Sequence, residues 1–284
     1  MLVSERIGQL FIDGDRLEYT EYGSGERWVV LLHAPLMSRR MHQPLARALA
    51  GRGLHVVTLD LLGHGRSDRP ADPLAYSTTR FADQVVALLD HLGATDALVG
   101  GTSLGANVAL EVAVAEPGRV RGLLLEMPVL DHALTAGLLS MTPLMLTARY
   151  LPWTVTGVRK ATKAVAKGIV PFWAGVALDA CNQRPGPMAA LVNGILFGRL
   201  APDSRQRRSV QAPALVVGHP ADPLHPFADA EMLAGELPHA RFVRAHNVLE
   251  WRLTPQRLDR EAVDFAVGCW HGQETRPRQR RARR

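Results

Sequence analysis

The stretch GGTSLG at residues 100–105 contains Ser103 between Gly101 and Gly105, in the pattern G-x-S-x-G. A serine in this pattern can act as a nucleophile if a sharp turn exposes its hydroxyl and a base takes the proton. The alternative is an incidental serine, because serine and glycine are both common in turns. An apolar run precedes Ser103 and a helix-like stretch begins at Leu104. This context favours a nucleophile elbow, with the Leu104 N–H facing a developing oxyanion at the helix N-terminus.

A nucleophilic serine needs a histidine base, and the expected chain order is serine, acid, histidine. His246 follows the last predicted strand directly and precedes the final predicted helix, so we predict that it is the base. His239 lies at the opposite end of that strand and should face away. The histidines beyond Ser103 are His132, His219, His225, His239, His246 and His271.

The acid of such a triad is expected at a carboxyl end of the sheet, where it orients the imidazole and stabilises its charged form. Asp222 follows a predicted strand at 214–217 and is our first choice. Asp131 and Glu126, after and at the end of the preceding strand, are the alternatives. A purely structural turn before Pro223 also remains open for Asp222.

The elements that position these residues alternate between strand and helix. A β-hairpin is predicted over 7–22 around Asp13-Gly14, and the following alternation indicates an α/β fold with a mostly parallel sheet and helices on both faces. The predicted strands cover 28–32, 55–59, 97–99, 120–125, 214–217 and 241–243, and the predicted helices cover 41–51, 78–92, 104–115, 227–237 and 255–269.

The alternation breaks between residues 128 and 210, where helix-like stretches rich in Leu, Met, Ala and Trp are separated by Pro and Gly. We interpret 128–210 as a helical insertion, the cap segment, in one α/β core formed by 1–127 and 211–272. Residues 273–284 form a basic tail, which we expect to be disordered.

Several motifs together make the chain resemble the α/β-hydrolase fold superfamily over roughly residues 5–270. They are His33 at a strand end, DLLGHGRSDRP at 60–70, GGTSLG at 100–105 and VVGHPADPLHP at 216–226. The resemblance implies a cap-containing, esterase-like serine hydrolase with Ser103 as nucleophile, Asp222 as acid and His246 as base, and with the cap segment as a lid. Dehalogenases and epoxide hydrolases of this superfamily usually carry Asp where this chain has Ser103.

Two departures from the family pattern bear on function. Many relatives carry His-Gly and then a residue whose N–H completes the oxyanion hole, whereas here His33-Ala34 is followed by Pro35, which has no N–H. Leu36 or Ala34 could replace it in a shifted loop. Relatives often have Gly before the histidine base, where this chain has Ala245. These departures keep a second hypothesis open, a non-hydrolytic ligand-binding protein on the same fold.

The composition of the chain indicates which general classes of protein it does not belong to. The hydrophobic fraction is 47%, which is enough for a large core, and no apolar run of about 18 residues predicts a membrane span. The charged N-terminal stretch does not resemble a signal peptide, and Cys181 and Cys269 suggest free thiols, so we expect a cytoplasmic protein. We expect no metal or cofactor, because neither ligand spacing nor a phosphate-binding loop is present.

The net charge is +6, and six arginines of the tail account for that number. We expect a solvated tail rather than a nucleic-acid site, since no aromatic residues interleave with the arginines. The sequence does not predict an oligomeric state. We therefore expect hydrolysis of a small apolar ester or related acyl substrate. The tail arginines are Arg276, Arg278, Arg280, Arg281, Arg283 and Arg284.

Overall fold

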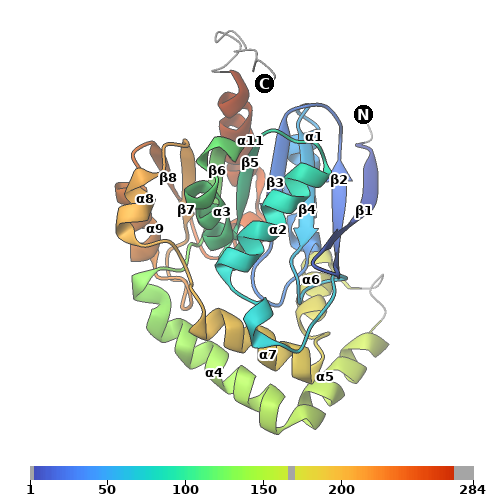
Figure 1. Cartoon of the computed structure of the whole chain (residues 1–284). Coiled ribbons are helices and arrows are strands. Elements are labelled where there is room, and N and C mark those ends of the chain that lie inside the picture. Colours follow the sequence, from blue (N-terminus) through green and yellow to red (C-terminus); the bar gives the residue numbers. More distant parts are fainter. Residues whose placement is uncertain (1–2, 166–169, 272–284) are drawn as a thin grey trace.

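The computed structural model describes residues 3–165 and 170–271 and contains an eight-stranded sheet in the order β1-β2-β4-β3-β5-β6-β7-β8 (Figure 1). The hairpin strands β1 and β2 are antiparallel, β2 pairs antiparallel with β4, and every later pairing is parallel. This confirms the predicted mostly parallel sheet. The strands are β1 (Glu5–Ile12), β2 (Asp15–Tyr22), β3 (Trp28–Leu32), β4 (His55–Asp60), β5 (Ala97–Thr102), β6 (Val120–Glu126), β7 (Ala214–Gly218) and β8 (Ala240–Arg244).

Helices cover both faces of the sheet, as expected for an α/β fold. The helices are α1 (Gln43–Ala50), α2 (Thr78–His91), α3 (Leu104–Ala115), α4 (Leu134–Tyr150), α5 (Pro152–Ala164), α6 (Phe172–Ala180), α7 (Pro185–Phe197), α8 (Ser204–Ser209), α9 (Phe227–Glu236), α10 (Glu250–Leu253) and α11 (Gln256–His271). Short 3-10 turns occur at Arg39–His42, Pro73–Ala75, Pro117–Arg119 and Asp131–Ala133.

One hydrophobic cluster lies on each face of the sheet and holds the helices of that face in place. Residues of α2, α3 and α9 pack on one face, and residues of α1 and α11 pack on the other. Helix α3 is apolar on nearly every side, and its residues from Leu104 to Ala113 are all buried. A helix without a polar face belongs in the interior. Helix α3 is therefore packed against the sheet, and this packing fixes the position of its first residue, next to Ser103.

The helices α4 to α8 lie between β6 and β7 in the chain, and the described part of 128–210 contains no strand. In Figure 1, α4, α5 and α7 form a layer beyond one end of the sheet. A small cluster of Ala148, Val155 and Met188 joins these three helices. Among the described residues, no helix is both long and apolar enough to cross a bilayer. The basic tail at 273–284 lies outside the described residues.

Candidate active site

Ser103 lies in the sharp turn between β5 and α3, with φ 56° and ψ −113°. Its N–H donates to the Glu126 carbonyl at 2.9 Å, so the neighbouring strand holds the turn. The flanking glycines are needed for space: a Cβ on Gly101 or Gly105 would lie 2.4 or 2.1 Å from the Leu32 carbonyl oxygen. The positive φ of Ser103 is a strained backbone conformation for a residue other than glycine, and such strain is typical of functional turns.

The imidazole that meets Ser103 is that of His225. Its Nε2 lies 2.9 Å from Ser103 Oγ, and its Nδ1 lies 2.9 Å from Asp222 Oδ2. Three groups are thus joined in a row, serine hydroxyl to imidazole to carboxylate. This is the geometry in which a histidine can take a proton from a serine while a carboxylate fixes its tautomer.

A single turn after β7 supplies both Asp222 and His225. Asp222 Oδ1 accepts hydrogen bonds from the N–H groups of Leu224 at 2.8 Å and His225 at 3.1 Å, which is an Asx-turn. Burial raises the pKa of the Asp222 carboxyl, but the hydrogen bonds from the His225 ring and from the two N–H groups outweigh it. The pKa therefore lies below its ordinary value, and Asp222 is ionised at neutral pH.

The expectation that His246 meets Ser103 was wrong about the geometry. Side chains alternate at the end of β8, so that Ala245 is buried while His246 points outward with 71% of its side chain exposed. Its ring lies 3.5 Å from Glu250, and its N–H donates to the same carboxylate. The Ala245 N–H continues the ladder to the Gly218 carbonyl at 2.9 Å, which fixes this register.

Neither of the two alternative acids takes the place of Asp222 beside the imidazole of His225. Glu126 is buried and engaged elsewhere: its carboxylate lies 2.7 Å from Arg252 and 3.1 Å from His219. Burial raises the pKa of Glu126, but the charge of Arg252 and the His219 contact bring it far below the usual range. Asp131 has an exposed side chain, 3.9 Å from Arg207.

The loop after β3 contains the residues expected to donate backbone N–H groups to an oxyanion. Not every residue of this loop has an N–H group without an acceptor. The Ala34 N–H points to the sulfur of Met41, 3.2 Å away, and Pro35 has no N–H. Leu36 has φ 63°, and its N–H has no acceptor among the described residues. Leu104 is the first residue of α3, where N–H groups lack an intrahelical acceptor. Among the described residues, the N–H groups of Leu36 and Leu104 therefore have no hydrogen-bond acceptor.

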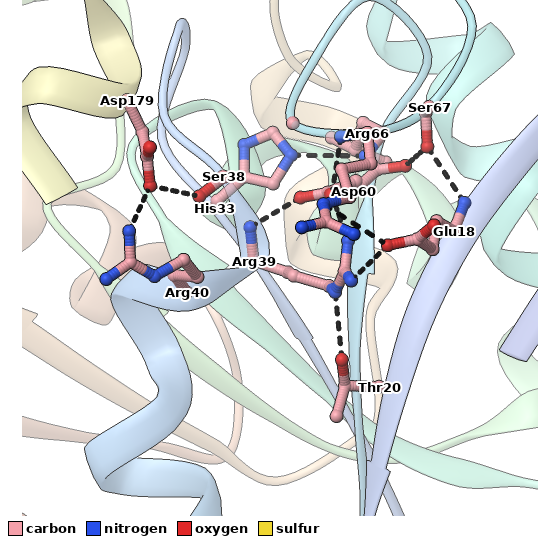
Figure 2. A network of polar contacts seen from close by, with 12 residues as sticks. Glu18, Thr20, His33, Ser38, Arg39, Arg40, Asp60, Arg66, Ser67 and Asp179 are labelled. Atoms are coloured by element: carbon pink, nitrogen blue, oxygen red, sulfur yellow. Dashed lines mark hydrogen bonds and ion pairs between the residues drawn. The ribbon is translucent and has the colours of Figure 1, made fainter. Parts of the chain in front are cut away.

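A network of polar side chains holds this loop at its C-terminal end (Figure 2). The buried Arg39 guanidinium binds Asp60, Glu18 and Thr20, and the Arg39 backbone N–H donates to Asp60 Oδ1 at 2.6 Å. From α6, Asp179 binds Arg40 at 2.6 Å. Residues of β2, β4 and the cap segment thus all bind the 3-10 turn Arg39–His42.

A second cap contact reaches the loop directly. Gln183 is buried, and its Nε2 donates to the Leu36 carbonyl at 3.0 Å. The Gln183 carbonyl in turn accepts a hydrogen bond from Arg69, which also donates to the Gly63 and Gly65 carbonyls. Leu36 is therefore positioned from the cap side by an amide whose nitrogen and oxygen both have hydrogen-bond partners.

His33 and His64 are buried and have structural contacts. The Leu61 N–H donates to His33 Nε2 at 3.1 Å, so the ring proton lies on Nδ1 and faces the Ala34 carbonyl at 2.9 Å. Burial lowers the pKa of both imidazoles, which keeps them neutral. The rings lie 4.6 Å apart between their centroids. They pack the base of the loop rather than reach Ser103.

Comparison with known proteins places the chain among enzymes of this architecture. The family model described as alpha/beta hydrolase fold matches residues 27–249. A haloalkane dehalogenase of Mycolicibacterium paratuberculosis is 27% identical over 79% of each chain. A 2-hydroxymuconate semialdehyde hydrolase of Pseudomonas putida is 40% identical, but over 29% of this chain and 30% of that protein.

The fold is shared with solved structures over nearly the whole length. The enol-lactonase of Burkholderia xenovorans superposes with a TM-score of 0.74 and 20% identity, covering 92% of this chain and 100% of that one. Such identity shows the fold, and the family-model match extends over most of the sequence. The relatives named as hydrolases agree with the expected enzyme class, and the chain belongs to the α/β-hydrolase fold family.

Proposed function

We propose that the protein is a serine hydrolase that cleaves a small apolar ester or related acyl substrate through an acyl-enzyme. The observation that carries this proposal is the pair of 2.9 Å hydrogen bonds that link Ser103, His225 and Asp222. Ser103 is the proposed nucleophile, His225 replaces His246 as the proposed base, and Asp222 keeps its proposed role as the acid that orients the imidazole.

The chemistry follows from these contacts. His225 Nε2 takes the hydroxyl proton as Ser103 Oγ attacks the substrate carbonyl, and a tetrahedral oxyanion forms. His225 then gives this proton to the leaving alkoxide, which departs as an alcohol. In the second half, His225 takes a proton from water, the hydroxide attacks the acyl-enzyme, and the proton returns to Ser103 as the carboxylic acid leaves. Asp222 stabilises the imidazolium in both halves.

Two N–H groups are proposed for the oxyanion hole, those of Leu104 and Leu36. Leu104 lies at the N-terminus of α3, where the helix dipole favours negative charge. Leu36 takes over from Pro35, and its position depends on Gln183. One donor of this kind is worth about 100-fold or more in turnover, so the substitution by Pro35 need not abolish catalysis if Leu36 serves.

The cap segment is proposed as the lid over this site. Its Gln183 donates to the Leu36 carbonyl and its Asp179 pairs with Arg40, so the cap segment is held against the loop after β3. We keep the cytoplasm as the proposed location, since both cysteines of the described chain are free thiols.

The test uses an activated short-chain ester and a fluorophosphonate probe with the wild-type protein and Ser103→Ala. We expect ester turnover and covalent labelling in the wild type and neither in the variant. A matched control is Ser140→Ala, which changes a serine of α4 in the cap. Labelling or turnover that persists in Ser103→Ala would refute the proposal, whatever the substrate.

The competing proposal is a non-hydrolytic ligand-binding protein, and the observation that favours it is Pro35 at an expected donor position. This proposal predicts that Ser103 reacts poorly with the probe and that ester turnover does not exceed the background rate. Ester turnover separates the two possibilities: the hydrolase turns over the ester at Ser103, whereas a binding protein is inactive even when Pro35→Gly adds an N–H at the expected donor position.

A further inference from the structure

The outer face of helix α4 is apolar although it faces solvent. Of its seventeen residues, Ala148 alone is buried. Leu134, Leu138, Leu146 and Tyr150 are each at least 44% exposed, so the solvent-facing half of the helix carries large apolar side chains. A helix on the surface of a globular protein normally presents charged and polar residues there.

The apolar surface continues around the corner from α4 into α5. Tyr150 is 71% exposed and Trp153 is 70% exposed, and Val158 follows at 51%. In Figure 1, α4 and α5 run along the edge of the molecule farthest from the sheet. Contiguous exposed apolar residues of this kind mark an interaction surface.

The charge around this surface is mostly positive, and the exposed Asp131 directly before α4 is the exception. Between His132 and Pro202 the sequence contains a single acidic residue, Asp179, which is paired with Arg40 of the core. The basic residues of the same stretch are Arg149, Arg159, Lys160, Lys163, Lys167, Arg184 and Arg199. Arg149, Lys160 and Lys163 are exposed on α4 and α5 beside the apolar residues.

We propose that this cap surface binds the anionic face of a lipid bilayer, with α4 and α5 lying in the plane of the membrane. We define the cap surface as Leu134, Leu138, Leu139, Leu146, Tyr150, Trp153 and Val158, with Arg149, Lys160 and Lys163.

A bilayer fits better than a second copy of the chain for a physical reason. In a symmetric dimer the cap surface would meet itself and bring its own cations together without acidic partners. Anionic headgroups supply the missing negative charge, while the acyl boundary accepts leucine side chains. Tyr150 and Trp153 are the residue types that favour the interface between the two.

The experiment measures partitioning of the full-length protein onto vesicles. Vesicles of phosphatidylcholine with about 30% phosphatidylglycerol are compared with phosphatidylcholine alone. We expect about a hundred-fold tighter binding to the anionic vesicles, since each of the three basic residues of the cap surface contributes about five-fold. High salt should remove this preference.

Two variants test the two halves of the surface. Leu139→Ser with Trp153→Ser should lower partitioning about ten-fold through lost apolar burial, and Lys160→Glu with Lys163→Glu should lower it at least as much. Phe11→Ser is the control, because Phe11 is 67% exposed on β1 away from the cap. The arginine-rich tail is present in every variant, so its own attraction to anionic lipid cancels in the comparison.

The outcome is independent of the proposed hydrolase, because ester turnover in solution should be unchanged in the cap variants. Anionic-vesicle binding that survives both double variants would assign binding to another part of the chain and overturn the proposal. Absence of binding to either vesicle would also overturn it. Self-association abolished by the cap variants, without vesicle binding, would assign the surface to a second copy instead.

Discussion

Replacing Asp222 by Asn separates the two tasks of this carboxylate. Oδ1 closes the Asx-turn by accepting the N–H groups of Leu224 and His225, and Oδ2 accepts the His225 Nδ1 proton. An Asn side chain can keep the first contact through its carbonyl oxygen. Its NH₂ group then faces His225 Nδ1 and donates, so the ring proton moves to Nε2.

The consequence is a histidine in the wrong tautomer. With Nε2 protonated, His225 cannot take the proton of Ser103, although its ring and the backbone keep their positions. We expect a decrease in kcat of about four orders of magnitude, equivalent to about 5.5 kcal/mol in the barrier. The free energy of unfolding should change by less than about 1 kcal/mol, because the turn persists.

The assay is steady-state hydrolysis of an activated ester, with urea unfolding measured on the same preparations. Asp222→Ala serves as the comparison: it also loses the turn, which leaves two N–H groups unpaired and costs about 1 kcal/mol or more of stability. If Asp222→Asn retained kcat within about ten-fold of the wild type, Asp222 would not set the His225 tautomer, and the proposed role of the acid would be refuted.

Three further predictions follow from the surroundings of the site. Gly105→Ala should destabilise the protein by about 3 kcal/mol or more and abolish turnover, since its Cβ would lie 2.1 Å from the Leu32 carbonyl; a wild-type melting temperature would contradict this. Gln183→Leu should lower kcat more than it changes KM by releasing Leu36, whereas an unchanged kcat would exclude Gln183 as a positioning residue. Burial lowers the pKa of His42 to about 4, so the unfolded chain binds the proton first and stability falls as pH drops below 6.5, by about 3 kcal/mol at pH 4; urea midpoints that stay constant from pH 7 to 4.5 would contradict this.

The fold was predictable from the sequence because its local signals agree with its tertiary structure. The buried strands are continuous apolar runs, and Leu104–Ala115 matches α3 at both ends. The Asp13-Gly14 turn was readable because both residues adopt positive φ, 53° and 90°, as a two-residue hairpin requires. Element boundaries differ by only a few residues, as at the start of α1.

The candidate site was predictable in part. Ser103 and Asp222 meet through an imidazole, but the sequence argument assigned that imidazole to the loop after the last strand. Strand alternation at Ala245 turns His246 outward, and this register depends on pairing with β7, which a sequence pattern does not display. His225 also satisfies the expected chain order and follows Asp222 by three residues in the same loop, but the position of His246 directly after the last predicted strand outweighed it.

The outward face of the cap could not be predicted, because composition alone does not distinguish core from surface. The sequence predicts helices rich in Leu and Met within 128–210, but the structure shows that α4 contacts chiefly α7 and α5 and leaves its other face to solvent. Which apolar face is covered depends on the placement of neighbouring helices.

The central claim is that His225, and not His246, activates Ser103. The most direct measurement is the rate of fluorophosphonate labelling of Ser103, followed by mass spectrometry of the intact protein, in His225→Ala and His246→Ala. We expect a decrease of at least about a thousand-fold in the first variant and less than about two-fold in the second, whose side chain is exposed, with both melting like the wild type. Rapid labelling of His225→Ala together with loss of labelling in His246→Ala would contradict the account.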